Sequence, residues 1–397
     1  MTRMKSLMFV AAMSLLIIPL SHGSRAAQQE TPLTIAHILP YSGKGADWGK
    51  KGRIDADLAL EDINRSGGIN GHPLEIITYD SAGAVEQAVL LTRKAAQENK
   101  VLFILGPYFS AEDEVCFPIA NELKVPMVGP TSAKPDLAAN NRPWTFRNTA
   151  TNDKIVGPSV DAFLKRYPNV KRMAIVVDVK DAWSKNLGVD IFPEFLKAKG
   201  IDVVTGTNPI AIQTGATDVS AQVTKLKYLN ADAVAIAPLY MDSATFALEM
   251  KRQGLNIPVL SSMTMVQPAF IEISKSSAEG WIGSSTFWPD SPDAATQNFI
   301  SRFEKAAKEI TPHAPFPGYA DPNIYDAIMI TAQIMRANKI TPETPLEKAR
   351  ELIREGWQNV RDYKGIAGTV SILPNGEGDL KVWPIELKGG KFQAIQN

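Results

Sequence analysis

The segment YSGKGADWGKKG, residues 41–52, combines four glycines and three lysines directly after an apolar run. Such a composition between a strand and a helix is typical of a loop that cradles phosphate with backbone N–H groups. A P-loop is excluded, because Gly49-Lys50 is followed by a second lysine and Lys44 occupies the position of the first glycine. A dinucleotide-binding loop is excluded because Trp48 stands where its third glycine belongs. We therefore expect this loop to hold something other than a nucleotide.

Groups that could support hydrolysis or metal binding are sparse. Behind a predicted signal peptide the chain keeps only His37, His72 and His313, and C-x-x-C, H-E-x-x-H and G-x-S-x-G motifs are absent from the sequence. Cys116 is the single cysteine and has apolar neighbours, which favours a buried, inert thiol and excludes an intrachain disulfide. We expect no metal, no cofactor and no catalytic residue; an exported hydrolase is a remote alternative.

The first 26 residues have the features of a secretory signal peptide. Arg3 and Lys5 precede the apolar run LMFVAAMSLLIIPL, and Ser24 and Ala26 form a small-residue cleavage site before Ala27. The run is shorter than the ~20 residues needed to span a bilayer, and no cysteine follows it for lipid attachment. We expect cleavage near Ala27 and a soluble exported protein, in preference to a retained membrane anchor.

Length and charge limit the architecture and the partners. About 370 residues remain after cleavage, more than a single hydrophobic core usually serves, so two domains are expected. The sequence is 45% apolar and 21% charged, with a formal net charge of zero, which provides no basic surface for a polyanion. Nucleic acid is therefore an unfavourable partner, and we expect a monomer.

The hydrophobic pattern predicts strands that alternate with amphipathic helices, which is typical of βαβ units with parallel sheets and of the α/β fold class. The alternation runs once to about residue 150 and then restarts, so two α/β lobes are expected. Near the C-terminus, residues 368–392 predict a hairpin that turns at Asn375-Gly376. The predicted strands are 33–39, 74–80, 101–107, 125–130, 172–179, 201–206, 231–240 and 257–262.

Ligands of open α/β sheets bind at the carboxyl ends of the strands. There the first lobe carries Trp48, either a ligand-facing wall or a packed anchor, and the segments GPYFSAED and GPTSAKPD. The former opens a helix at Ser110, with Asp113 as its expected capping-box partner. The equivalent loops of the second lobe are DAWSKN, PLYMDS and SSMTM. Two such rims predict a cleft between lobes.

Nearly the whole mature chain resembles the periplasmic solute-binding proteins of ABC importers, specifically the branched-chain amino-acid-binding type. The resemblance rests on the order of INRSGGINGHPLE, GPYFS, VPMVGPTSAKPDL and GTVSILPNGEGDL, each weak alone but specific together. It implies the type I periplasmic binding fold, in which two Rossmann-like lobes with parallel sheets are joined by three crossings, here near residues 146–149, 283–286 and 363–369. The implied lobes are residues 27–147 plus 286–365 for lobe I and residues 148–285 plus 366–397 for lobe II.

The resemblance also implies which residues contact the ligand. In amino-acid-binding members the first lobe fixes the ligand carboxylate with a serine, a threonine and backbone N–H groups. Ser110 matches the serine, with Phe109 just before it. The threonine position falls on Ala133, with Thr131 and Ser132 immediately before it.

In the second lobe the resemblance places aromatic residues at Trp183 and Tyr240, whereas the acidic partner of the ligand ammonium falls on Met263. A buried ammonium without a carboxylate is strongly unfavourable, so a free amino acid is disfavoured unless Asp181 or Asp242 takes over that role. Met263 is otherwise one more core methionine or a soft apolar contact to the ligand.

Together, Trp48, Phe109, Trp183 and Tyr240 predict an aromatic wall, and Ser110 predicts an anion site at a helix start. An aromatic carboxylate matches both features, and we expect its capture by hinge closure for delivery to the membrane permease of an ABC importer. The alternatives are an amino-acid receptor, an amide or urea binder of the same family, and the sensing domain of a receptor.

Overall fold

The computed structural model describes residue 1, residues 31–310 and residues 315–396; the predicted signal peptide, apart from Met1, and His313 lie outside them. Within the described chain, the first sheet is parallel and has the order β2-β1-β3-β4-β5. The α/β class predicted from the hydrophobic pattern is confirmed. The strands are β1 (Leu33–Leu39), β2 (Leu74–Asp80), β3 (Ile104–Leu105), β4 (Met127–Gly129) and β5 (Thr145–Arg147).

The second sheet of the described residues has the order β16-β15-β11-β10-β9-β6-β7, with β8 also paired to β6. It is parallel except at β15, which runs antiparallel to both β11 and β16. Its strands are β6 (Arg172–Asp178), β7 (Asp202–Val203), β8 (Ile210–Ile212), β9 (Ala233–Ile236), β10 (Val259–Leu260), β11 (Ile282–Ser285), β15 (Trp383–Lys388) and β16 (Lys391–Ala394).

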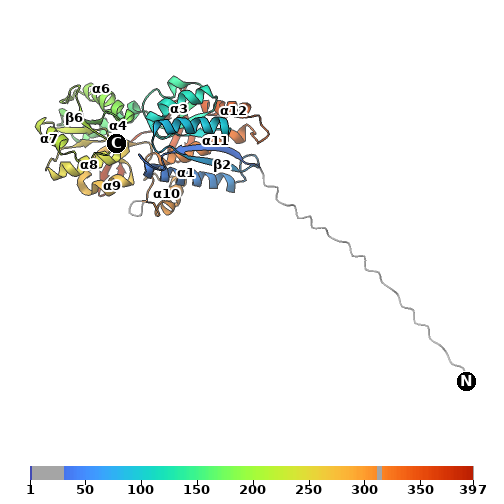
Figure 1. Ribbon diagram of the computed structural model, residues 1–397. Helices are drawn as coiled ribbons and strands as arrows, with labels where there is room; N and C mark the ends of the chain where they lie inside the picture. The colour runs from blue at the N-terminus through green and yellow to red at the C-terminus, as the bar shows by residue number, and fades with distance from the viewer. Residues whose placement is uncertain (2–30, 311–314, 397) are drawn as a thin grey trace. The chain divides into compact units, whose positions relative to one another are not determined.

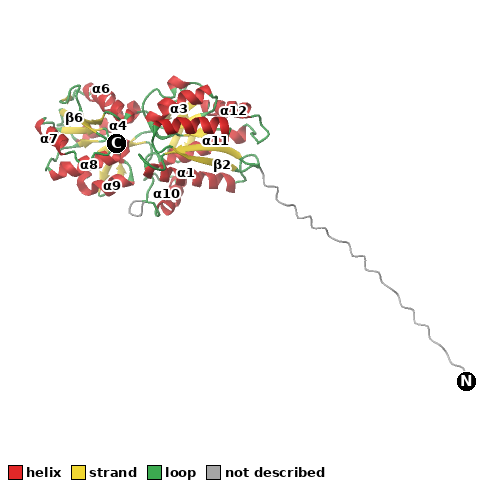
Figure 2. Cartoon of the chain, in the orientation of Figure 1, coloured by secondary structure: helices red, strands yellow, loops and turns green. Residues whose placement is uncertain are grey.

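Helices gather around each of the two sheets (Figure 1), and Figure 2 distinguishes them from strands and loops. The bounds are α1 (Ala46–Arg65), α2 (Val85–Arg93), α3 (Ser110–Glu122), α4 (Asn152–Arg166), α5 (Ala182–Lys185), α6 (Phe192–Ala198), α7 (Ser220–Tyr228), α8 (Tyr240–Arg252), α9 (Pro268–Ser274), α10 (Ala294–Ala307), α11 (Asp321–Ala337) and α12 (Leu346–Gln358). None of the helices in the described part of the chain has the length and apolarity needed to cross a membrane.

Strand β1 illustrates why the first sheet is covered on both faces. Because successive side chains of a strand point to opposite faces, Ile35 and Leu39 join a core with α1 and α11, whereas Ala36 and Ile38 join a core with α2 and α3. A strand buried on both sides has a nearly continuous apolar sequence, as LTIAHIL does. The prediction of a buried strand at this position is confirmed.

The strand order creates a switch point in each sheet. The chain leaves β1 for the edge strand β2 and returns to β3 on the other side of β1. It likewise leaves β6 for β7 and returns to β9 on the other side of β6. Connections that depart in opposite directions leave a crevice outside the carboxyl ends of the strands, where ligands of such sheets bind. The loops after β1, β3, β6 and β9 therefore define the place to search for a site.

The hairpin predicted over residues 368–392 is confirmed for residues 368–380, where β13 (Gly368–Ile372) pairs antiparallel with β14 (Gly378–Leu380). The remaining residues belong instead to the antiparallel pair of β15 and β16. Together with β12 (Tyr363–Gly365) it forms a separate small sheet, and β15 joins the large second sheet only from Trp383 onward. The crossing expected near residues 363–369 therefore coincides with this small sheet. The lobe boundaries remain predictions.

Candidate functional site

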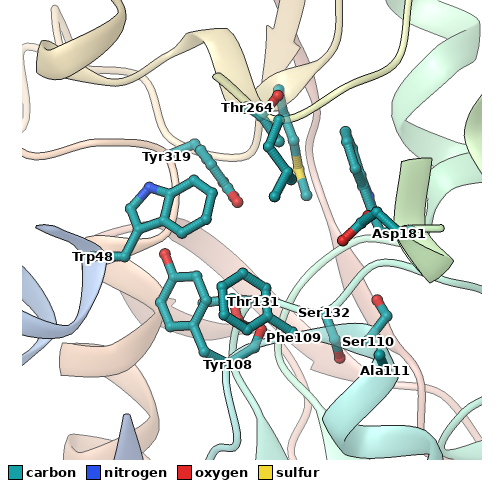
Figure 3. Close-up of a pocket in the computed structure, with 13 residues that line it drawn as sticks. Trp48, Tyr108, Phe109, Ser110, Ala111, Thr131, Ser132, Asp181, Thr264 and Tyr319 are labelled. Atoms are coloured by element: carbon teal, nitrogen blue, oxygen red, sulfur yellow. Dashed lines mark hydrogen bonds between the residues drawn. The ribbon is translucent and has the colours of Figure 1, made fainter. Parts of the chain in front are cut away.

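The loops at the carboxyl ends of the strands of both sheets enclose a common cavity (Figure 3). Trp48, Tyr108 and Tyr319 lie on one side of it, and Ser110, Ala111 and Asp181 lie on the opposite side. The residues that line the cavity are Trp48, Tyr108, Phe109, Ser110, Ala111, Thr131, Ser132, Asp181, Trp183, Leu239, Met263, Thr264 and Tyr319.

Trp48 is the centre of an aromatic cluster. Its ring stacks on Tyr108 with centroids 5.3 Å apart, and meets the edges of Phe109 at 5.8 Å and Tyr240 at 5.0 Å. Such stacked and edge-on pairs each contribute about 0.5–1.5 kcal/mol beyond the burial of their area. Tyr240 packs against Trp48 but does not line the cavity. Its hydroxyl donates to Asp47 Oδ2 at 3.1 Å. Trp48 is thus both a packed anchor and part of the cavity wall.

Ser110 lies at the start of α3, but the expected capping box is wrong in detail. Phe109 precedes the helix, and the Glu112 carboxylate, not Asp113, accepts from the N–H groups of Tyr108 at 3.2 Å and Phe109 at 3.0 Å. Ser110 is therefore the first helical residue. The N–H groups of Glu112 and Asp113 donate to the carbonyl oxygen of Phe109 at 3.0 Å each, whereas those of Ser110 and Ala111 have no carbonyl of a preceding turn to accept them. Ser110 Oγ accepts only a long bond, 3.4 Å, from Lys134 N, which leaves its O–H able to donate.

The hydroxyl groups of Thr131 and Ser132 are already engaged within the protein. Thr131 donates to the carbonyl oxygen of Tyr108, and Ser132 donates to Asp113 Oδ2. Burial raises the pKa of the Asp113 carboxyl well above its usual range. Ala133 is buried but does not line the cavity. Of the hydroxyl groups predicted to face an anion, only that of Ser110 lacks a competing acceptor among the described residues.

Arg147 holds the loop that carries Thr131 and Ser132 in place. This fully buried guanidinium donates to the carbonyl oxygens of Ser132 and Lys134, and to the carboxylate of Glu377. Glu377, beside β14, also accepts from Ala138 N at 3.1 Å. Residues 132–138 are thus held by a buried ion pair whose two members are far apart in the sequence.

A second ion pair links the rims of the two sheets. Lys44 Nζ, from the loop between β1 and α1, lies 2.7 Å from Asp181 Oδ2, at the start of α5. The other carboxylate oxygen of Asp181 accepts from Ser184 N at 2.9 Å. Lys44 Nζ also lies 5.0 Å from the centre of the Phe109 ring. The lysine-rich loop was first considered as a phosphate-binding loop. In the structure, its Lys44 instead binds a carboxylate of the same protein.

The wall contributed by the second sheet is mostly apolar. Met263, in a short 3₁₀ turn after β10, is 1% exposed, and Trp183 and Leu239 lie on the same wall. The cavity itself measures about 20 Å³, room for little more than a water molecule. A larger ligand can therefore enter only if side chains move or the two rims separate.

The structure brings most of the predicted site residues together and adds others. Trp48, Phe109, Ser110, Thr131, Ser132, Trp183 and Met263 line the cavity, whereas Ala133 and Tyr240 lie behind it. The lining residues that the sequence analysis did not place at the site are Tyr108, Ala111, Leu239, Thr264 and Tyr319, and Asp181 was considered only as an alternative partner for a ligand ammonium. Tyr108 lies inside the quoted GPYFSAED segment, and Tyr319 follows a Pro-rich loop with no periodic pattern. Burial raises the phenol pKa of both tyrosines.

The groups weighed for catalysis or metal binding lie elsewhere. Cys116 is buried, and burial raises the pKa of its thiol to about 12, in agreement with the prediction of an inert thiol. His37 is fully buried within β1, and burial lowers the pKa of its imidazole to about 3. Within residues 31–310 and 315–396 we find no group of three or more His, Cys, Asp and Glu side chains placed to hold a metal.

We expect Ser110→Ala to weaken binding of an anionic ligand while leaving the melting temperature nearly unchanged. The loss of one donor costs about 0.5–1.5 kcal/mol for a neutral acceptor and up to about 3 kcal/mol for a carboxylate. Calorimetric titration and thermal unfolding of the same preparation separate the two effects. Ser220→Ala, at the first residue of α7 and outside the cavity, is the control. Unchanged affinity with a lower melting temperature would show that Ser110 has only a structural role.

Known proteins resemble this chain in sequence and in fold. Residues 32–391 match the sequence profile of the family described as periplasmic binding protein. A Leu/Ile/Val-binding protein of Rhizobium johnstonii is 29% identical over 299 residues, which cover 74% of this chain and 77% of that protein. A leucine-binding protein of Thermotoga maritima is 24% identical with a TM-score of 0.78, covering 92% of this chain and 98% of its own. A solute-binding protein of R. palustris in complex with benzoate is 20% identical with a TM-score of 0.79, covering 92% and 96%.

Proposed function

We propose that this chain, which belongs to the periplasmic binding protein family, captures a small aromatic carboxylate in the cavity between its two sheets for an ABC importer. The proposal places the protein in the periplasm, where a membrane permease would receive the ligand from it. It assigns no catalytic step to the chain, since a binding protein releases its ligand unchanged.

The observation that carries the proposal is the polarity of the cavity. Among the described residues that line it, Asp181 is the one carboxylate, and Lys44 already pairs with it at 2.7 Å. The position at which the family resemblance expects an acidic residue holds the buried Met263. An ammonium group in this cavity would therefore lose its hydration without gaining an unpaired carboxylate, which is unfavourable by several kcal/mol.

The remaining features support an anion with an aromatic body. Ser110 and the first turn of α3 offer donors to a carboxylate at one side, and the positive end of a helix favours a negative charge. Trp48, Tyr108 and Phe109 offer ring faces and edges on the other side. The benzoate complex of the R. palustris protein supports the view that this fold can hold an aromatic acid.

A second candidate is an amino-acid receptor. The Rhizobium johnstonii relative binds leucine, isoleucine and valine by its name, and Asp181 does reach the cavity. In that case the Lys44–Asp181 pair would have to open so that Asp181 could receive the ligand ammonium. The two candidates differ in one measurable quantity, the effect of an α-ammonium group on affinity.

Calorimetric titration of the ligand-stripped protein tests the proposal. We expect cinnamate-type, 3-phenylpropanoate-type or hydroxybenzoate-type acids to bind at least about a hundredfold more tightly than phenylalanine or leucine, since about 1.4 kcal/mol corresponds to tenfold. Scattering of the same samples should show a smaller radius of gyration with bound ligand if the rims close around it. Micromolar binding of leucine or phenylalanine, with no response to the aromatic acids, would overturn the proposal in favour of the amino-acid receptor.

A further inference from the structure

The Lys44–Asp181 pair is unusual because it places a cation of the protein where a cationic part of a ligand could be held. Lys44 belongs to the rim of the first sheet, and its ammonium reaches across to Asp181 on the rim of the second. The Asp181 side chain is 6% exposed and lines the cavity, whereas the Lys44 side chain is 32% exposed and approaches from outside it. The carboxylate is therefore a permanent part of the site, and the lysine neutralises it.

Asp181 has a direct bearing on which ligand the cavity accepts. It lies on the same side of the cavity as Ser110 and Ala111, the residues proposed to meet the ligand carboxylate (Figure 3). An unpaired Asp181 would repel that carboxylate and attract an α-ammonium group, because few water molecules screen charges in a small buried cavity. A paired Asp181 does neither. Whether Asp181 presents an unpaired negative charge to the ligand therefore depends on Lys44.

We propose that Lys44 is a specificity-determining residue. By pairing with Asp181, it occupies the carboxylate that could otherwise bind a ligand ammonium, so that carboxylates without an α-ammonium are accepted and α-amino acids are rejected. This inference rests on the proposed function and extends it, because it names the side chain that excludes the competing class of ligand. Exclusion by occupying a potential partner is a general route to specificity, since a competitor's charge is then left unpaired.

The matched ligands 3-phenylpropanoate and L-phenylalanine differ only in the α-ammonium group, so the ratio of their dissociation constants measures its effect. We expect Lys44→Met to lower the ratio of phenylalanine to phenylpropanoate dissociation constants by at least about tenfold, through tighter binding of phenylalanine and weaker binding of phenylpropanoate. Lys44→Arg should keep the ratio of the unmodified protein, because a guanidinium also pairs with a carboxylate. Lys50→Met, an exposed lysine of the same segment, is the control.

Removing the carboxylate tests the same inference from the other side. Asp181→Asn should give no gain in phenylalanine binding, and in the double variant Lys44→Met/Asp181→Asn the gain of the single Lys44→Met variant should disappear. Phenylpropanoate binding by the unmodified protein reports on the proposed function, whereas a gain of phenylalanine or leucine binding in Lys44→Met over Lys50→Met reports on the role of Lys44. Absence of that gain, or its persistence without Asp181, overturns the inference whichever ligand the unmodified protein binds.

Discussion

Replacing Lys51 by methionine is expected to destabilise the folded protein by up to about 3–5 kcal/mol, the upper range for leaving a buried charge uncompensated. Lys51 is 1% exposed on α1, and the nearby carboxylates of Asp321, Asp47 and Asp55 oppose the effect of burial, which lowers its pKa. Asp55 is fully buried, and neither of its carboxylate oxygens has a hydrogen-bond partner among the described atoms. No hydrogen bond or ion pair joins Lys51 to Asp55 or Asp321 among the described residues, so Lys51 offsets the burial of these carboxylates through its nearby charge alone.

The loss in the free energy of unfolding caused by Lys51→Met is expected to be larger at pH 8 than at pH 5. Burial raises the pKa of both Asp55 and Asp321 above the ordinary value of 3.8, while Lys51 lowers it in each case. Without Lys51 these folded-state pKa values rise further, so near pH 5 the folded protein binds protons that the unfolded chain does not. Stability is then regained as the pH falls and lost as it rises.

Chemical unfolding at both pH values measures this effect. Lys50→Met is a matched control, because the neighbouring Lys50 is exposed and exposed substitutions usually change stability by less than about 0.5 kcal/mol. Adding Asp55→Asn to Lys51→Met should restore part of the lost stability, since one unpaired carboxylate is removed. A Lys51→Met variant as stable as Lys50→Met at pH 8 would contradict the argument.

Arg147→Met is expected to have a comparable effect, a loss of about 3–5 kcal/mol, together with weaker ligand binding. The buried Glu377 would lose its partner, and the carbonyl oxygens of Ser132 and Lys134 would lose their donor. The loop beside Ser110 would then no longer be held in one position. The guanidinium contacts the loop and does not line the cavity. The loss of affinity would therefore result from displacement of the loop and not from a lost contact to the ligand.

The chain offers a matched control for this variant. Lys154 pairs with Asp379 at 3.3 Å, close in sequence to Glu377, but this pair is partly open to solvent, with the Lys154 side chain 33% and the Asp379 side chain 58% exposed. An exposed pair contributes about 0–1 kcal/mol, so Lys154→Met should leave stability and affinity nearly unchanged. Thermal unfolding and ligand titration of both variants decide the matter. Equal behaviour of Arg147→Met and Lys154→Met would mean that the buried pair does not fasten the loop.

The α/β class, the two rounds of strand–helix alternation and the loops that form the rims could all be predicted from the sequence. These features follow from the spacing of apolar residues, which each segment carries locally. Trp48, Phe109, Ser110, Trp183 and Met263 lie at the cavity because the carboxyl end of a parallel strand has a fixed place in such a sheet. Whether they contact a ligand remains the proposal.

The partner that each polar group takes could not be predicted from the sequence and follows from the folded structure. Asp113, expected to cap α3, accepts from Ser132 instead, and Lys44, expected in a ligand loop, pairs with Asp181. Tyr319 reaches the cavity from a loop without any pattern, and Arg147 meets Glu377 across most of the chain. Hydrogen bonds and ion pairs depend on distances of about 3 Å between groups, and for segments remote in sequence these distances are fixed by packing of the sheets and helices rather than by local spacing.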